Sequence, residues 1–182
     1  AFSGTKLREI VIPRTVTRMG YGVFQKTKIK TLYLPDGMNL DGGSEFVDCT
    51  ELTEVSVGGN ISNSFGDCTA LTKVTVREGA TSIGGRAFQG CTALTTVTLP
   101  GGIQEISKSA FSGCTALSTV HFGGSQAGWQ AVTVRPDNDA LKRARVDYAA
   151  AAMLPAPKLT GSVNRYGELT LNWTAVKGAD SY

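Results

Sequence analysis

Four cysteines, at positions 49, 68, 91 and 114, are the most regularly spaced residues of this sequence that could do chemistry. Thiols pair as disulfides, bind metal ions or act as nucleophiles. The sequence contains no C-x-x-C pair and only one histidine, which argues against a zinc site. Disulfides and buried, unpaired thiols are the interpretations that remain to be weighed against the geometry of the chain.

Catalysis has little support from the other reactive residues. His121 would have to serve as the base of any Ser–His–Asp or Cys–His arrangement, because no second histidine exists. Glu9 and Glu54 could pair as in a glycoside hydrolase, but two repeats separate them, and strand spacing puts them about 10 Å apart. The glycine pairs at 42–43, 58–59, 84–85, 101–102 and 123–124 read as turns with positive φ, not as phosphate-binding loops. We expect no enzyme activity and no cofactor or metal.

An internal repeat determines where all of these residues lie. Six of the seven phenylalanines keep a spacing of 19 to 23 residues: Phe2, Phe24, Phe46, Phe65, Phe88 and Phe111. A Leu or Ile follows each Phe after five or six residues, and further apolar residues follow three and five positions later. A second apolar patch precedes four of the later phenylalanines, at 16–19, 61–63, 81–83 and 103–106. Such a period is typical of a solenoid.

Each repeat predicts one short strand. The alternating apolar residues and the Thr and Val content suit a pleated strand, which Pro or Gly then ends, with Arg77 as the exception. We expect a right-handed solenoid with few short helices, whose parallel sheet contains residues 9–12, 31–34, 54–57, 73–76, 96–99 and 119–122. Stacking buries Phe on Phe and Leu on Leu. The cysteine Cβ vectors then run parallel, which favours buried thiols over disulfides.

The repeat line I-x-x-x-A-F-x-G-C-T-x-L-x-x-V-x-L-P resembles the BspA-like leucine-rich repeats of bacterial surface proteins over residues 1–123. Thr5 and Thr27 stand where the later copies have Cys, and the fourth copy is shorter by four residues between Val57 and Phe65. The resemblance implies a leucine-rich repeat solenoid, extracellular or on the cell surface, in a family associated with adhesion.

Residues 124–148 resemble the capping segment that often closes such arrays. Ser125 and Asn138 are candidate N-caps of two short helices, the second over 140–144, and "AVTV" and "ARVDY" read as strands. A solenoid needs a terminal unit that covers its last apolar layer. We expect Trp129, Val132 and Leu141 to provide that cover. The basic side chains of Arg135, Lys142, Arg143 and Arg145 should point to water.

The composition changes after the cap. Residues 149–157 form an Ala/Pro linker, and 158–182 resemble the start of a fibronectin type III domain, with "NRYG" as a turn, Leu169, Leu171 and Trp173 alternating on a strand, and Tyr182 opening a third strand. That fold takes about 100 residues. We therefore expect the chain to be part of a longer protein, as the start at Ala1–Phe2 in mid-repeat also suggests.

The remaining candidate for function is the outward side of the predicted sheet. A net charge of +3 gives no reason to expect a nucleic acid partner, and no apolar run is long enough to insert into a membrane. We expect a monomer that recognises a protein or glycan through the concave face. An accessory region of a larger surface enzyme and a ligand-free stalk are the alternatives. The candidate contact residues are Tyr33, Glu54, Ser56, Lys73, Thr75, Thr96, Thr98, Thr119 and His121.

Overall fold

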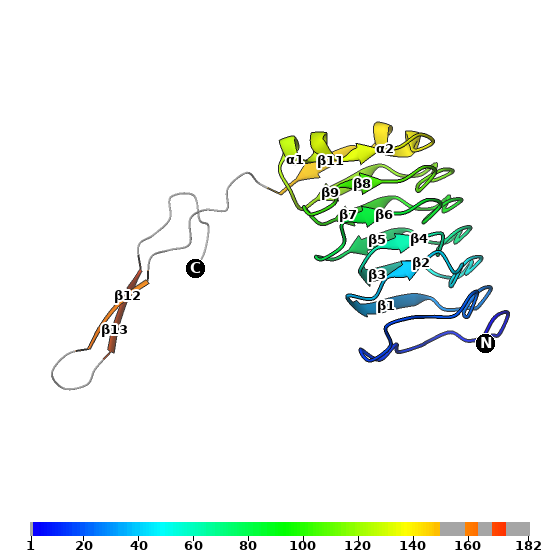
Figure 1. Ribbon diagram of the computed structural model, residues 1–182, viewed down its shortest axis with the longest axis horizontal. Helices are drawn as coiled ribbons and strands as arrows, with labels where there is room; N and C mark the ends of the chain where they lie inside the picture. Colours follow the sequence, from blue (N-terminus) through cyan, green and yellow to red (C-terminus); the bar gives the residue numbers. More distant parts are fainter. Residues whose placement is uncertain (1, 150–158, 164–168, 174–182) are drawn as a thin grey trace. The chain divides into compact units, whose positions relative to one another are not determined.

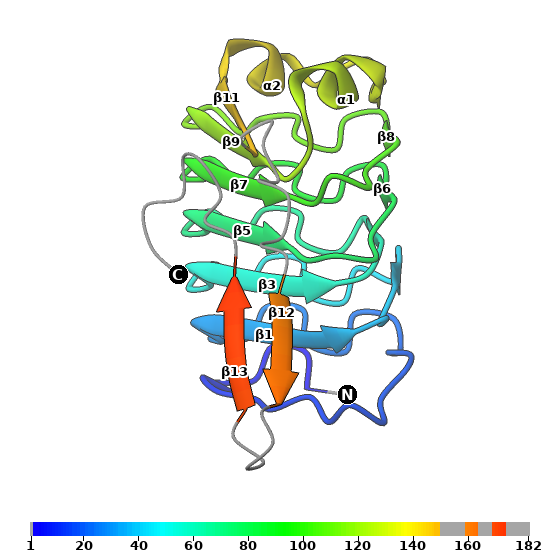
Figure 2. The same ribbon diagram turned by 90° about the vertical axis from the view of Figure 1, so that its left-hand side faces the viewer.

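The alternating apolar residues of the repeats form one parallel sheet. The computed structural model describes residues 2–149, 159–163 and 169–173. The strands of this first sheet are β1 (Thr31–Asp36), β3 (Glu54–Gly58), β5 (Lys73–Val76), β7 (Thr96–Leu99), β9 (Thr119–Phe122) and β11 (Arg145–Tyr148). They pair in that order and every pair is parallel, which confirms the predicted solenoid (Figure 1, Figure 2).

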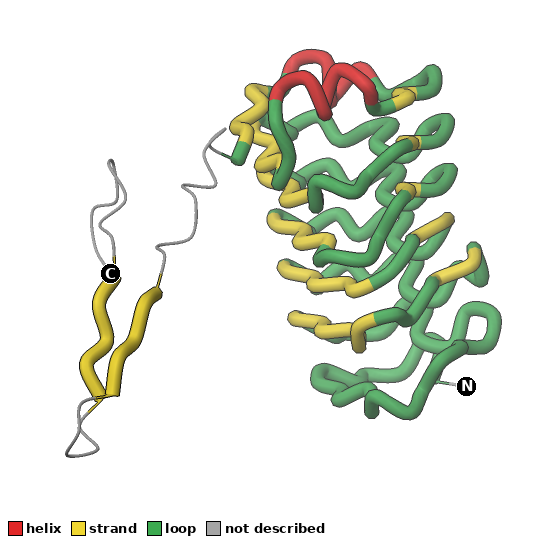
Figure 3. The backbone as a smooth tube through the Cα atoms, turned by 60° about the vertical axis from the view of Figure 1, so that its left-hand side comes forward, coloured by secondary structure: helices red, strands yellow, loops and turns green. Residues whose placement is uncertain are grey.

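A second parallel sheet runs along the opposite side of the coils. Its strands have only two residues each: β2 (Leu40–Asp41), β4 (Ile61–Ser62), β6 (Ser82–Ile83), β8 (Glu105–Ile106) and β10 (Thr133–Val134). Figure 3 shows them as short strand segments between loops. Three of the four second apolar patches contain one of these strands, whereas 16–19 does not. The short fourth repeat keeps its strand β4, so the missing residues shorten only the connection.

Stacked phenylalanines form the centre of the core. The rings of Phe2, Phe24, Phe46, Phe65, Phe88 and Phe111 lie 5.3 to 5.5 Å apart between centroids, with planes within 19° of parallel. The last four rings are fully buried, and the Leu and Val of the same repeats are buried beside them. Each coil therefore buries its apolar side against its two neighbours.

The strand predicted over 9–12 is absent from the described structure. Near this segment, backbone hydrogen bonds to the next coil occur only just before it. There the amides of Lys28 and Lys30 donate to the carbonyls of Leu7 and Arg8 at 2.9 and 3.3 Å. Val11 is 89% exposed. The segment lies at the end of the stack, so the backbone groups along one of its edges have no strand to pair with.

The positive φ expected at the glycine pairs is largely absent. Only Gly42 among them has a positive φ, of 91°. Some of the others are needed because neighbouring coils approach closely: a Cβ at Gly59 would lie 2.3 Å from the carbonyl oxygen of Met38, and one at Gly84 would lie 2.6 Å from Cβ of Ser62. Close backbone approach is the second reason for which a chain requires glycine.

The cap closes the stack with two helices, α1 (Gln126–Ala131) and α2 (Asp139–Arg143), which lie at the end of the array in both Figure 1 and Figure 2. The Ser125 side chain accepts a bond from the Gly128 amide, as expected of an N-cap. The predicted covering residues Trp129, Val132 and Leu141 all pack on the core. The four basic residues named above are exposed. Neither of these helices, the only ones in the described residues, has the length and apolar character of a membrane span.

Asn138 ends the repeat in a way that the sequence did not indicate. It occupies the N-cap position of α2 but its side chain makes no capping bond. In the interior coils, the amide of each Phe donates to a backbone carbonyl of the next coil, as Phe88 does to Ala110 at 2.8 Å. The amide of Phe111 instead donates to Oδ1 of Asn138 at 2.9 Å.

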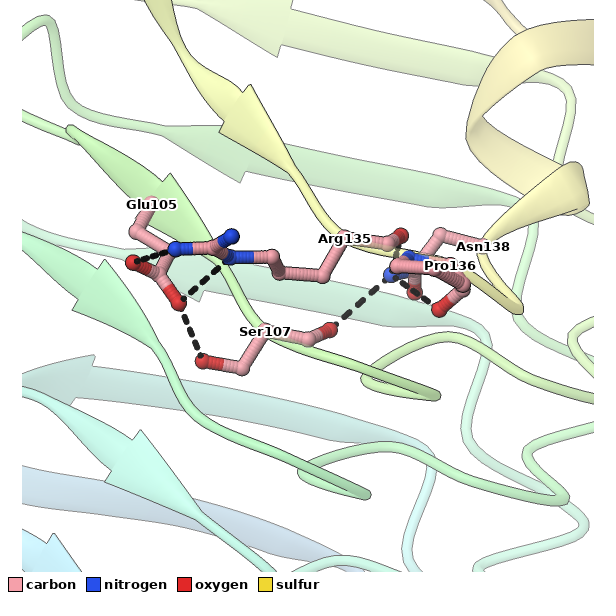
Figure 4. Close-up of polar contacts among 5 residues, drawn as sticks. All are labelled: Glu105, Ser107, Arg135, Pro136 and Asn138. Carbon is pink, nitrogen blue, oxygen red and sulfur yellow. Dashed lines mark hydrogen bonds and ion pairs between the residues drawn. The ribbon is translucent and has the colours of Figure 1, made fainter.

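The rest of the Asn138 amide is equally engaged. Its Nδ2 donates to the carbonyls of Ser107 and Arg135, both at 2.9 Å, and the side chain is fully buried (Figure 4). Asp137, with φ 65°, repeats the backbone of Ser109, with φ 60°, in the coil before. Residues 136–138 thus imitate the turn of a further repeat up to the position where its Phe would stand.

Residues Ala150–Tyr182 form a second compact unit, separate from Ala1–Ala149. Its described part is an antiparallel pair, β12 (Leu159–Val163) and β13 (Leu169–Trp173). The predicted strand with Leu169, Leu171 and Trp173 is thus present. The predicted "NRYG" turn, Tyr182 and nearly all of the linker lie outside the described residues.

The Phe column predicts unequal effects of two substitutions in one repeat. Phe88→Ala should lower the free energy of unfolding by about 3–5 kcal/mol, because Phe88 is fully buried between two rings. Thr96→Ala, on the outer face of β7, should change it by less than about 0.5 kcal/mol. Urea unfolding of both variants measures the difference, and equal losses would mean that the inner and outer faces have been exchanged.

Asn138 predicts a local effect at the end of the array. Asn138→Ala should cost about 2–3 kcal/mol, because it leaves the buried amide of Phe111 without an acceptor. Amide hydrogen exchange should accelerate at Phe111 and remain slow at Phe65, whose amide donates to the Ala87 carbonyl.

Asn39→Ala is the matched control for Asn138. Asn39 Oδ1 also accepts a backbone amide bond, from Asn60 at 2.9 Å, but it is exposed. Its loss should cost less than about 1 kcal/mol, because water replaces the lost acceptor. A larger effect at Asn39 than at Asn138 would contradict the role assigned to the cap.

Candidate functional site

Two columns of outward side chains cross the first sheet, as the repeat period predicts. The strand register aligns Thr31, Glu54, Lys73, Thr96, Thr119 and Arg145 in one column, and Tyr33, Ser56, Thr75, Thr98, His121 and Asp147 in the other. All nine predicted contact residues belong to these columns. We call this surface the outer sheet face. Glu9 and Val11, which belong to the strand expected over 9–12, lie before the first strand.

Two charges on neighbouring strands of the first column, Glu54 and Lys73, neutralise each other. Lys73 Nζ lies 2.9 Å from a carboxylate oxygen of Glu54, and both side chains are half exposed. Such a surface pair adds little to stability. Because Glu54 faces a lysine, and Glu9 lies outside the sheet, the structure provides no paired carboxylates of the glycosidase type between these two residues.

Tyr33 is held in place by a residue that breaks the repeat. The guanidinium carbon of Arg77 lies 4.1 Å from the centre of the Tyr33 ring, in a cation–π contact. Arg77 also donates to Asp36 Oδ1 at 2.7 and 2.9 Å, to the Ser56 hydroxyl at 2.6 Å and to the Leu34 carbonyl. One arginine therefore ties the ends of three neighbouring strands together and orders the most exposed aromatic ring of the face.

In the sequence, Arg77 stands out only as the exception to the Pro or Gly that ends each strand, and Asp36 does not stand out at all. That exception was the available signal. The position after a strand lies at the edge of the outer face, so an arginine there reaches across its neighbours, as a proline or glycine does not.

An open depression of about 610 Å³ lies beside this cluster, where the strands end. We call it the strand-end depression. Its lining residues come from the ends of β1, β5, β7 and β9: Tyr33, Asp36, Thr75, Val76, Arg77, Glu78, Thr98, Leu99, Pro100 and Gly123. Three of the nine predicted contact residues, Tyr33, Thr75 and Thr98, thus share one concave feature.

His121 lies further along the second column, beside the cap. Its Nδ1 is 3.4 Å from a carboxylate oxygen of Asp147, which also accepts a bond from Arg145 at 2.7 Å. This aspartate on β11 was not selected from the sequence. No group of three or more His, Cys, Asp or Glu side chains with metal-binding geometry occurs in the described part of the chain.

The four cysteines form a buried column beside the phenylalanines. All are free thiols. Each Sγ donates to the carbonyl of the Phe in the preceding coil, at 3.1 to 3.2 Å. Thr27, at the equivalent position of an earlier coil, bonds to the Phe24 carbonyl at 2.8 Å. The prediction of buried, unpaired thiols is confirmed, and the thiols take part in the backbone bonding of the core.

Burial makes these thiols weak acids. It raises the pKa of Cys114 to about 12 and raises the pKa values of Cys49, Cys68 and Cys91 as well, since the core does not solvate a thiolate. Because the thiolate is the reactive form, none of the four is suited to nucleophilic catalysis or to easy oxidation.

The thiol column predicts a titration result. All four cysteines should fail to react with a thiol reagent in the folded protein at pH 8, and all four should react after denaturation without reductant. Reaction before unfolding would contradict burial, and no reaction after it would indicate disulfides.

The raised pKa values also set a direction for pH dependence. Above about pH 9 the thiols ionise in the unfolded chain and remain protonated in the folded one, so stability should fall as the pH rises from about 9 towards 12. Cys114→Thr should show a smaller loss than the parent over this range in urea unfolding.

Comparisons with known proteins agree with this architecture. A family model described as the BspA type leucine rich repeat region, with 6 copies, matches residues 1–64 and 60–128. No curated protein matches the chain significantly.

Two solved structures are similar to the chain. One is a leucine rich cell surface protein from Faecalibacterium prausnitzii, with 24% identity over 72% of this chain and 52% of that chain, and a TM-score of 0.44. The other is a leucine-rich repeat protein from Bacteroides ovatus, with 17% identity over 82% of this chain and 53% of that chain, and a TM-score of 0.33. The chain thus spans about half the length of these proteins. Since the family model covers most of its residues, the chain belongs to the family of BspA type leucine-rich repeat proteins.

Proposed function

We propose that this repeat array is a non-catalytic recognition scaffold, extracellular or on the cell surface, that binds a protein or glycan on its outer sheet face. The observation that carries the proposal is the strand-end depression with Tyr33 ordered beside it. An array that served only as a stalk would not require an arginine that holds an exposed aromatic ring in place.

The chemistry of the depression suits binding better than turnover. Tyr33 is 55% exposed and combines an apolar ring with a hydroxyl, a combination favoured at interfaces. Thr75 and Thr98 add hydroxyls that donate and accept hydrogen bonds. These groups stand on rigid strands, so little conformational entropy is lost when a ligand binds.

The second unit bears on the role of the array. We propose that residues 158–182 begin a fibronectin type III-like spacer, for which the antiparallel pair of β12 and β13 is the supporting observation. Such a spacer is equally compatible with the accessory region of a larger surface enzyme. In that case residues 1–182 alone should show no hydrolase activity.

The test is a binding screen followed by a single substitution. The chain is applied to an array of glycans and to purified extracellular-matrix proteins. Any ligand found should bind Tyr33→Ala at least about tenfold more weakly, because ring and hydroxyl are both lost. Isothermal titration calorimetry measures the change.

Tyr21→Ala is the matched control, since Tyr21 is 80% exposed but lies outside the first sheet. It should bind like the parent. A combined Tyr33→Ala, Glu54→Ala, Lys73→Ala variant that folds and still binds fully would exclude the outer sheet face. The absence of any ligand would favour a structural stalk.

A further inference from the structure

The charge that the strand-end depression presents to solvent is negative. Asp36 and Glu78 both line it, together with the single cation Arg77. The Arg77 side chain is only 21% exposed, since it lies on Tyr33 and donates to its neighbours, whereas the Asp36 side chain is 62% exposed. What a ligand meets at this rim is therefore carboxylate oxygen and not guanidinium.

The carboxylates of Asp36 and Glu78 can still accept hydrogen bonds from a ligand. Both bonds from Arg77 to Asp36 end on Oδ1. Among the residues that the structure describes, Oδ2 of Asp36 has no side-chain partner and Glu78 has no ion pair. The other carboxylate of this region, Glu54, is already neutralised by Lys73. The depression thus combines two available carboxylates with an exposed aromatic ring.

We propose that the strand-end depression receives a lysine or arginine side chain from an extended segment of a protein partner. This inference rests on the proposed function and selects a protein over a glycan as the ligand. A basic side chain matches all three features at once. Its aliphatic stem packs on the exposed ring of Tyr33, and its charged head reaches Asp36 and Glu78.

A neutral glycan matches the site less well. It would use the ring and the threonine hydroxyls, but it would leave the excess negative charge without a counter-charge. Charge complementarity at a rim raises the association rate and makes binding dependent on salt. A basic segment should therefore bind more weakly as ionic strength increases, whereas a neutral glycan should not.

The experiment selects peptides without prejudging their charge. A random dodecapeptide library is panned against the full chain, and selected peptides are synthesised with a fluorescent label for anisotropy. The inference requires a shared Lys or Arg in them. Replacing that residue with Gln should weaken binding about tenfold, and so should raising the salt from 50 to 500 mM.

Protein variants then locate the contact. Asp36→Asn with Glu78→Gln removes both charges, while the amide oxygen of Asn can still accept from Arg77. This double variant should bind the basic peptide about tenfold more weakly. Glu51→Gln is the control, since it removes one exposed carboxylate that pairs with Lys28 outside the depression, and it should bind like the parent.

The outcomes that overturn this inference differ from those that overturn the proposed function. A selected consensus without a basic residue, unchanged binding by the double variant, or no selected peptide would each overturn it. If a glycan from the earlier array then binds the parent and the double variant equally but not Tyr33→Ala, the outer sheet face remains the binding site and only the ligand class is wrong.

Discussion

The stacking of like residues at one fixed interval is the constraint on which the rest of this structure depends. Each Phe ring of the column lies 5.3 to 5.5 Å from its neighbours between centroids, and the Leu, Val and Cys columns follow the same interval. A coil cannot bury its apolar side alone, so its stability comes from the coils on either side. The same interval sets the spacing of the outer columns, so the core determines the geometry of the surface.

A stacked array must also end, and in this one the cap reproduces the contacts that a further coil would make. Trp129 meets Phe122 edge to face, at 5.2 Å, and covers the last layer of the sheet. Asn138 supplies an amide oxygen where every interior coil supplies a backbone carbonyl. Arg135 adds an ion pair to Glu105 of the preceding coil, beside Ser107 (Figure 4). The cap thus satisfies the bonding of the last coil without offering a Phe for another to stack on.

Periodic features could be predicted from the sequence, and features that depend on distance between coils could not. The regular spacing of residues in the sequence predicts five of the six repeat strands, the buried thiols and the outer columns. The close approach of neighbouring coils at Gly59 and Gly84 could not be predicted from the sequence, because a glycine can indicate either a positive φ or close packing. The prediction of a strand over 9–12 was wrong. An alternating pattern indicates which side of a strand is apolar, but it does not indicate whether a neighbouring strand is present to pair with it. Asn138 and Asp147 were missed as contacts because their partners lie 27 and 26 residues away in the chain.

The candidate site follows from the same distinction. Residues that repeat in every coil are explained by packing, so they carry no information about a ligand. Information specific to this protein must lie where the outer positions change from coil to coil, as at Tyr33, Glu54 and Lys73, or where a structural rule is broken, as at Arg77. The depression lies beside Arg77. This arginine follows the one repeat strand that neither Pro nor Gly ends, and it places a cation against an aromatic ring and leaves carboxylates facing outward. The candidate site thus lies where the chain departs locally from the repeat that stabilises it.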